Sequence, residues 1–330
     1  MHARSLMRTA AAAATILTLG VLAASGSAAQ PATTTGSLRD PITYQLPGDQ
    51  LFPEGMGYDA TSGYFYTGSL TDGSIVRGSI YAANAETFLP AGGNGRKQTL
   101  GVRPAGHLLY VAGGASGRVW VYDIRTKRLL GAMRTGAKRT LTNDIAVAPN
   151  GAAYVTDSYS PFLYRVTKTR GVYRMTKFVD FRGTAFRYST KPSAINADGI
   201  AIAARGRYVL VNALTAGALY RIDTQTRKVT RIRVPGAPLT NADGMVLDGT
   251  TLYVTRNANG TITKLKLFAN FTKARRTGSI TSPMFHFPTG LGLAPGRLLV
   301  LNAQLDKLLG AAPGTKPNPD LPFTVTSVVR

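Results

Sequence analysis

The sequence has 330 residues, a formal net charge of +23 and no cysteine. Without cysteine, disulfides, zinc–thiolate centres and thiol nucleophiles are excluded. The length suits one large domain, and the charge favours anionic partners such as cell-wall or surface polymers. The basic residues are spread over many segments rather than gathered in one motif, so we expect no specific nucleic-acid binding.

The first 29 residues have the pattern of a secretory signal peptide. Arg4 and Arg8 precede an apolar run over residues 10–24, and small residues precede a cleavage site after Ala29. The run is shorter than a membrane-spanning helix usually requires. We therefore expect a secreted, extracellular protein, with an uncleaved anchor as the alternative. Residues 30–40 are expected to be a flexible lead-in.

A unit of two short strands recurs along the rest of the chain. Its most regular copy opens with Asp243, alternates apolar residues, turns at Gly249 and returns through an apolar strand. Copies follow one another at intervals of roughly 45 residues. Their register residues are Glu54, Leu100, Asp144, Asp198, Asp243 and Thr289. Six such copies predict an all-β fold, a six-bladed β-propeller over residues 41–330.

Two segments interrupt the regular spacing. Residues 42–46 alternate like a strand and precede the first unit, so we expect them to close the ring beside residues 323–329. Residues 181–194 lengthen one interval between units. They are expected to form either a mobile loop at the channel mouth or a surface connection.

Acidic residues gather at the starts of the predicted first strands. In a propeller these strands line the central channel, and their starts converge at one mouth. Clustered carboxylates are costly unless they are protonated or bind a cation. Carboxylate and amide oxygens suit a hard ion such as calcium. The predicted metal ligands are Glu54, Asp198, Asp243 and Asn196, although any single one of them could be an ordinary turn residue.

Other polar residues are expected on the rim of the same mouth, because the second strands return to it. The predicted substrate-binding residues are Asn143, Asp144, Asp157, Asn212 and Arg256. Histidine chemistry has little support. His107 lies in a predicted turn and His286 in an apolar strand, so a Ser-His-Asp triad is not expected.

At these residues the chain resembles the SMP-30/gluconolactonase/LRE-like family of six-bladed propellers. The resemblance covers about residues 50–305 and rests on residues 52–55, 142–144, 198–199 and 241–245. It implies that Glu54 and Asp243 hold a divalent cation, that Asp243 also serves in acid–base catalysis, and that Asn143 contacts substrate. Two positions depart from the family pattern. Asp198 stands where the third ligand is usually Asn, and Leu141 stands where a substrate-binding Arg is often found.

Three functional hypotheses follow. The first is a monomeric, metal-dependent hydrolase of the lactonase or esterase type acting on a small lactone or ester. Its cofactor would be calcium, with zinc or manganese as alternatives, and Asp243 would be catalytic. The second is a non-catalytic binding or scaffold propeller with a structural ion. The third is a metal-free enzyme, which the many carboxylates disfavour.

Overall fold

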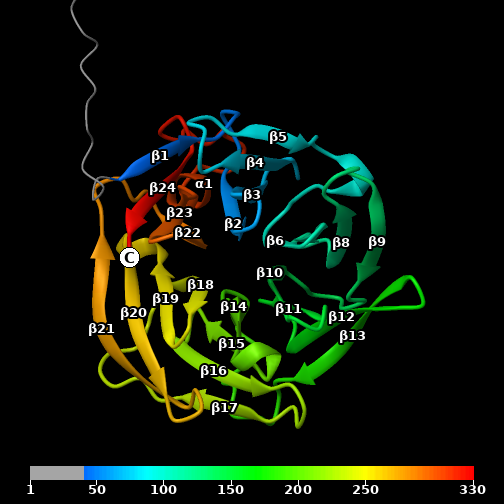
Figure 1. Ribbon diagram of the computed structural model, residues 1–330, viewed down its shortest axis with the longest axis vertical. Helices are drawn as coiled ribbons and strands as arrows, with labels where there is room; N and C mark the ends of the chain where they lie inside the picture. Colours follow the sequence, from blue (N-terminus) through cyan, green and yellow to red (C-terminus); the bar gives the residue numbers. More distant parts are fainter. Residues whose placement is uncertain (1–40) are drawn as a thin grey trace, which may run out of the picture. The chain divides into compact units, whose positions relative to one another are not determined.

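The computed structural model describes residues 41–330. The predicted signal peptide, its cleavage site and the lead-in lie outside the described residues. The predicted six-bladed propeller is confirmed: six four-stranded antiparallel sheets form a ring (Figure 1). No helix among the described residues is long and apolar enough to cross a membrane.

Each blade runs outward from the channel in four strands, which are consecutive in the first five blades. Blade 1 contains β2 (Pro53–Asp59), β3 (Tyr64–Ser69), β4 (Ile75–Ser79) and β5 (Glu86–Leu89). Blade 2 contains β6 (Val102–Ala105), β7 (Leu108–Ala112), β8 (Arg118–Asp123) and β9 (Leu129–Arg134). Blade 3 contains β10 (Thr142–Val147), β11 (Ala153–Asp157), β12 (Phe162–Thr169) and β13 (Val172–Asp180).

The second half of the ring repeats this order. Blade 4 contains β14 (Ala197–Ala203), β15 (Tyr208–Ala213), β16 (Ala218–Asp223) and β17 (Val229–Ile232). Blade 5 contains β18 (Ala242–Asp248), β19 (Thr251–Arg256), β20 (Thr261–Phe268) and β21 (Lys273–Thr281). Blade 6 contains β22 (Pro288–Ala294), β23 (Arg297–Asn302), β24 (Thr324–Val329) and, outermost, β1 (Ile42–Gln45). A short helix, α1 (Leu305–Leu309), lies between β23 and β24.

The ring is closed by strands from both ends of the domain, as predicted. Strand β1 pairs antiparallel with β24, and Tyr44 lies opposite Val325. Phe52, just before the first blade, meets Phe323 of the last blade edge-on, with ring centroids 5.1 Å apart. Both rings are fully buried. Closure therefore covers the outer edge of β24 and completes a hydrophobic core between the first and last blades.

The pairing of the two inner strands corrects the predicted register in blade 3. Ile145, Ile200 and Met245 occupy equivalent positions, each opposite a valine of the second strand. Counting back two residues places Asn143, not Asp144, in line with the other register residues. Those equivalents are Glu54, Asp198, Asp243 and Thr289.

Glycine follows the register residue in the neighbouring blades because the inner strands approach one another closely. A Cβ atom on Gly244 would lie 2.4 Å from the carbonyl oxygen of Thr289, and one on Gly199 would lie 2.1 Å from that of Asp243. Asp144 holds this place in blade 3. Its carboxylate lies in the channel wall rather than at the head of the strand.

The 181–194 segment is a surface connection anchored by aromatic contacts. Phe186 is buried and stacks on Phe181, with centroids 4.2 Å apart, and it also contacts Tyr220. The Tyr188 hydroxyl donates to the carbonyl oxygen of Tyr159. These contacts fix the segment to blades 3 and 4.

Candidate metal and catalytic site

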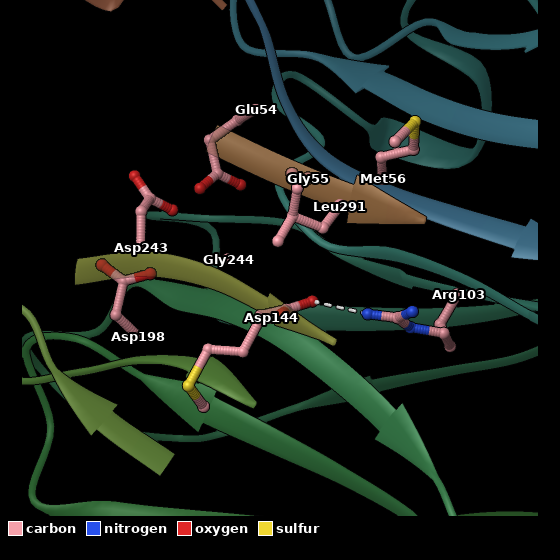
Figure 2. Close-up of a pocket in the computed structure, with 11 residues that line it drawn as sticks. Glu54, Gly55, Met56, Arg103, Asp144, Asp198, Asp243, Gly244 and Leu291 are labelled. Carbon is pink, nitrogen blue, oxygen red and sulfur yellow. Dashed lines mark ion pairs between the residues drawn. The ribbon is translucent and has the colours of Figure 1, made fainter. Parts of the chain in front are cut away.

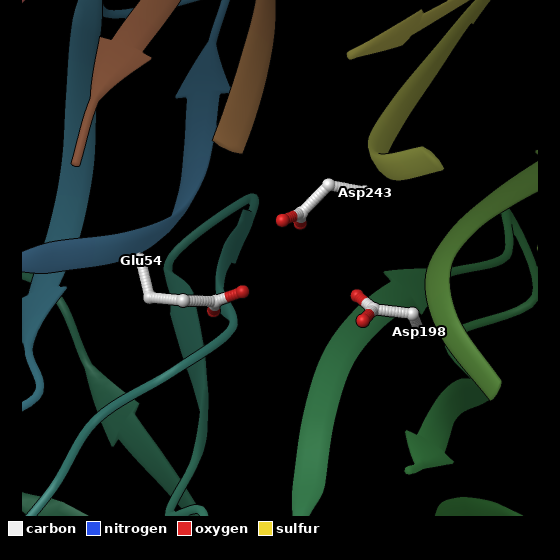
Figure 3. Close-up of side chains that lie close together, drawn as sticks. All are labelled: Glu54, Asp198 and Asp243. Carbon is white, nitrogen blue, oxygen red and sulfur yellow. The ribbon is translucent and has the colours of Figure 1, made fainter. Parts of the chain in front are cut away.

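Three buried carboxylates from three blades converge at one end of the channel. Glu54 begins on β2, Asp198 on β14 and Asp243 on β18, and each offers an oxygen within 4.8 Å of the others. Figure 3 shows the three side chains pointing toward a common centre. They are only 8%, 3% and 5% exposed. The predicted convergence of these first-strand starts is therefore present.

Burial and mutual repulsion make this group unfavourable in its charged form. Burial is the largest cause that raises the pKa of Glu54 and Asp198 well above their usual ranges, and the neighbouring carboxylates add to it. For Asp243, burial raises the pKa to about 7, opposed in part by a hydrogen bond from Asn257 and reinforced by Asp144. A bound cation would relieve this repulsion.

Unsatisfied acceptors occur on the strands that form this end of the channel. Glu54 Oε2, Asn143 Oδ1 and Asn212 Oδ1 are buried and have no hydrogen-bond partner. The amide nitrogens are engaged: Asn143 Nδ2 donates to Ser158 Oγ and Asn212 Nδ2 to the carbonyl oxygen of Asp243. Buried acceptors without donors are rare in folded proteins. An oxygen-only donor set of carboxylates and amides fits a hard cation.

The cavity between these groups is small. Its volume is about 10 Å³, close to what a single water needs. Glu54, Asp144, Asp198 and Asp243 line it, together with Arg103. It therefore has room for one ion or water rather than for an organic molecule.

Asp144 and Arg103 form the channel wall beside the three carboxylates (Figure 2). The guanidinium of Arg103 lies 3.7 Å from Asp144 Oδ1 and donates to the carbonyl oxygen of Ile145. Burial raises the pKa of the Asp144 carboxyl, and Arg103 offsets part of that rise. The structure thus brings Asp144 into the site, and it adds Arg103, which sequence reasoning missed.

Asn257 is a second residue that sequence reasoning missed. Its Nδ2 donates to Asp243 Oδ2 at 2.7 Å, and its Oδ1 accepts from the Ala258 N–H. Asn257 directly follows the strand-end residue Arg256. Ser158, which binds Asn143, likewise follows Asp157. A search one residue beyond the second-strand ends would have found both.

Asp157, predicted to contact substrate, has both carboxylate oxygens hydrogen-bonded to the neighbouring loops in the structure. Its Oδ1 accepts from the N–H groups of Leu141, Tyr159 and Ser160, and its Oδ2 accepts from the Thr140 hydroxyl. The side chain is fully buried. It therefore ties the loop before β10 to the loop after β11.

Two further predicted residues are engaged in loops. The Asn196 amide binds the backbone of Ser189 through both its atoms and also donates to the Ser158 carbonyl oxygen. The Asn196 amide therefore holds the 181–194 segment, although the residue lies only two positions before Asp198 in the sequence. Arg256 donates to the backbone and hydroxyl oxygens of Thr240 and does not line the cavity.

No protein-family model matches the sequence, and no curated protein matches it. Solved structures do. Regucalcin from Agrobacterium tumefaciens, a calcium-binding protein, matches with a TM-score of 0.58 at 15% identity, over 86% of this chain and 91% of that one. A luciferin-regenerating enzyme matches with a TM-score of 0.60 at 13% identity, over 88% of this chain and 96% of that one.

A third similar structure is the major allergen Mala s 1 of Malassezia sympodialis. It matches with a TM-score of 0.62 at 15% identity, over 89% of this chain and 96% of that one. Identities this low carry the fold and not the activity. The chain has the six-bladed propeller fold found in regucalcin and the luciferin-regenerating enzyme.

Proposed function

We propose that the chain is a secreted, metal-dependent hydrolase of the lactonase or esterase type, acting on a small lactone or ester at the channel mouth. The observation that carries the proposal is the convergence of three buried carboxylates on an ion-sized cavity. The calcium-binding description of the regucalcin neighbour and the enzymatic one of the luciferin-regenerating enzyme support it.

Glu54, Asp198 and Asp243 would hold the cation. Calcium suits this donor set best, and zinc or manganese are the alternatives. Bound there, the cation would supply a Lewis acid for a carbonyl oxygen.

The chain's own residues would orient substrate and move the proton. Asn257 holds Asp243 Oδ2 at 2.7 Å, which leaves Oδ1 to accept a proton from the attacking water. Burial raises the pKa of Asp243 to about 7, and a bound cation would lower it, so the attacking water must itself be made more acidic for Asp243 to take its proton. The unpaired Asn143 oxygen would accept a hydrogen bond from a substrate hydroxyl. Burial of the group keeps bulk water away from these atoms.

The test uses Asp243→Asn and the exposed Asp49→Asn as its matched control. We expect Asp243→Asn to lose calcium binding, and to lower turnover of a reactive member of a lactone and aryl-ester panel roughly 10²–10⁴-fold. The control should behave like the wild type. Turnover that survives both chelation and Asp243→Asn would reject the mechanism.

One observation favours a second candidate, a binding or scaffold propeller with a structural ion. The cavity of about 10 Å³ has room for the ion but not for a substrate beside it. Under this alternative, calcium raises the melting temperature while no member of the panel is turned over. The same experiment therefore separates the two functions.

A further inference from the structure

The end of the ring opposite the carboxylate site carries many exposed positive charges. Each inner strand starts at the site, and the strands of a blade are antiparallel. The turns between first and second strands and between third and fourth strands therefore all lie at the other end. We call this surface the far face. It also includes the end of β24 and the start of β1.

Nine exposed cations lie in or beside the turns of the far face, on blades 2 to 5. They are Arg125, Lys127, Arg128, Arg170, Arg205, Arg227, Lys228, Lys266 and Lys273. Within residues 41–330 none of them forms a salt bridge. The cationic charge of this face is therefore not neutralised internally.

The acids near the far face, by contrast, all have partners. Asp223 pairs with Arg207, Asp248 with Arg330 and Glu86 with Arg77. Asp59 and Asp123 accept hydrogen bonds from residues of their own turns. They serve the fold, and only the cations remain available to a partner.

Four of the cations occupy strained backbone positions. Lys127, Arg170, Arg205 and Arg227 have φ values of 59°, 50°, 52° and 59°, in the left-handed region that glycine adopts most easily. A charged side chain is therefore present at four turn positions where the backbone conformation favours glycine.

Exposed apolar side chains accompany the cations. Five of the eight large hydrophobic side chains that are exposed in the described residues lie on the far face. They are Ile42 (46% exposed), Tyr81 (82%), Val172 (53%), Phe268 (48%) and Val329 (43%). They come from blades 1, 3, 5 and 6, so that cationic and apolar groups together extend over all six blades.

We propose that the far face docks on an anionic lipid bilayer. A partner that meets groups on every blade must be flat and extended, which suits a membrane surface better than a single polymer strand. Anionic lipid headgroups attract lysine and arginine side chains near the membrane surface. Aromatic side chains are favoured at the level of the headgroups. The carboxylate site, at the opposite mouth, would then face the aqueous phase. This proposal does not depend on the proposed hydrolase activity.

The test compares two variants of the full chain that lose the same charge. One combines Lys127→Gly, Arg170→Gly, Arg205→Gly and Arg227→Gly, changes that the positive φ values accommodate. The control combines Lys97→Gln, Lys138→Gln, Arg187→Gln and Lys191→Gln, all exposed and on the loops of the site end. Binding is measured by co-sedimentation with vesicles of phosphatidylcholine, with and without phosphatidylglycerol. Melting temperature checks the fold.

We expect wild type and control to bind the phosphatidylglycerol vesicles far better than the neutral ones. The four-glycine variant should bind them roughly a hundredfold or more weakly, with its melting temperature preserved. Any binding through the apolar N-terminal segment would be equal in all three proteins and would not need phosphatidylglycerol. Equal loss in both variants, or no preference for anionic vesicles, would overturn the proposal. So would binding to soluble polyphosphate without binding to vesicles, since the partner would then be a polymer.

Discussion

At the residue scale, Asn257 sets the orientation of the central carboxylate. Its amide is the side-chain donor to Asp243, and partners of this kind typically contribute 10–100-fold to metal affinity. We expect Asn257→Ala to weaken calcium binding by about that factor. Isothermal titration of calcium measures it. Asn259→Ala, which removes only an exposed contact with Asn241, is the matched control and should bind like the wild type.

The same carboxylates predict an unusual dependence of stability on pH. Without a cation, burial raises the pKa of Asp243 to about 7 and those of Glu54 and Asp198 well above their usual ranges. The folded protein then holds more protons than the unfolded chain between roughly pH 4 and 7. The stabilisation is complete below that range and is lost as the pH rises through it.

We therefore expect the melting temperature of the chelated protein to fall between about pH 5 and pH 8. Calcium should abolish the fall, because it binds the ionised groups. Thermal scans with and without chelator over this range provide the measurement. A chelated protein that is more stable at pH 8 than at pH 5 would show that the carboxylates ionise without cost.

Sequence reasoning located part of the site and missed part of it, for physical reasons. Three site residues could be predicted because each lies at the start of a strand whose alternating pattern is visible in the sequence: Glu54, Asp198 and Asp243. Asn257 and Arg103 were not, because they reach the site from outside the register. Asn196 was misplaced for a similar reason: nothing in its sequence position shows that a folded segment takes up its amide. Which way a side chain points is decided by the neighbouring blades.

At the element scale, one carboxylate ties two loops of blade 3 together. Asp157 accepts three backbone N–H groups and a hydroxyl, and its removal would leave buried donors unsatisfied. We expect Asp157→Ala to destabilise the protein by about 3 kcal/mol or more. That corresponds to a fall in melting temperature of roughly 5–10 °C.

Calcium affinity separates this structural part from the predicted substrate-binding one. Asp157→Ala should lower the free energy of unfolding and leave calcium affinity within a factor of about three. The reason is that Asp157 holds two loops together and is not one of the proposed metal ligands. The control is Asp180→Ala, which removes an exposed pair with Arg182 and should change neither property. A variant that melts like the wild type but loses substrate affinity would restore the original assignment.

The strand register illustrates the limit of sequence patterns at this scale. Asn143 and Asp144 are both polar and both precede an alternating strand, so the sequence offers two registers one residue apart. Pairing of Ile145 with Val155 selects Asn143 as the register residue. Asp144 then takes the position that glycine holds in the other blades. This equivalence is visible only in the structure, where the glycines lie against the neighbouring inner strands.

At the scale of the whole molecule, the repeat determined the prediction more than any motif did. Six units of similar length cannot bury their faces separately, so stacking around a ring follows from the period. The number of blades and the closing strand were therefore predictable from the sequence. The gathering of exposed cations and exposed apolar side chains on the far face was not, because it depends on which turns share an end of the ring.

Ring closure gives the last prediction. Strand β1 buries Tyr44 and is followed by the buried Leu46, each 4% exposed, and it covers the edge of β24. Losing two such side chains costs about 3–6 kcal/mol. Deleting residues 30–47 should therefore lower the melting temperature by roughly 5–10 °C. It should also promote association through the uncovered edge, visible by size-exclusion chromatography. Deleting residues 30–40 leaves β1 in place and is the control. If both deletions melt like the full chain, closure by β1 contributes nothing to stability, and the ring is held by the contacts between the inner strands alone.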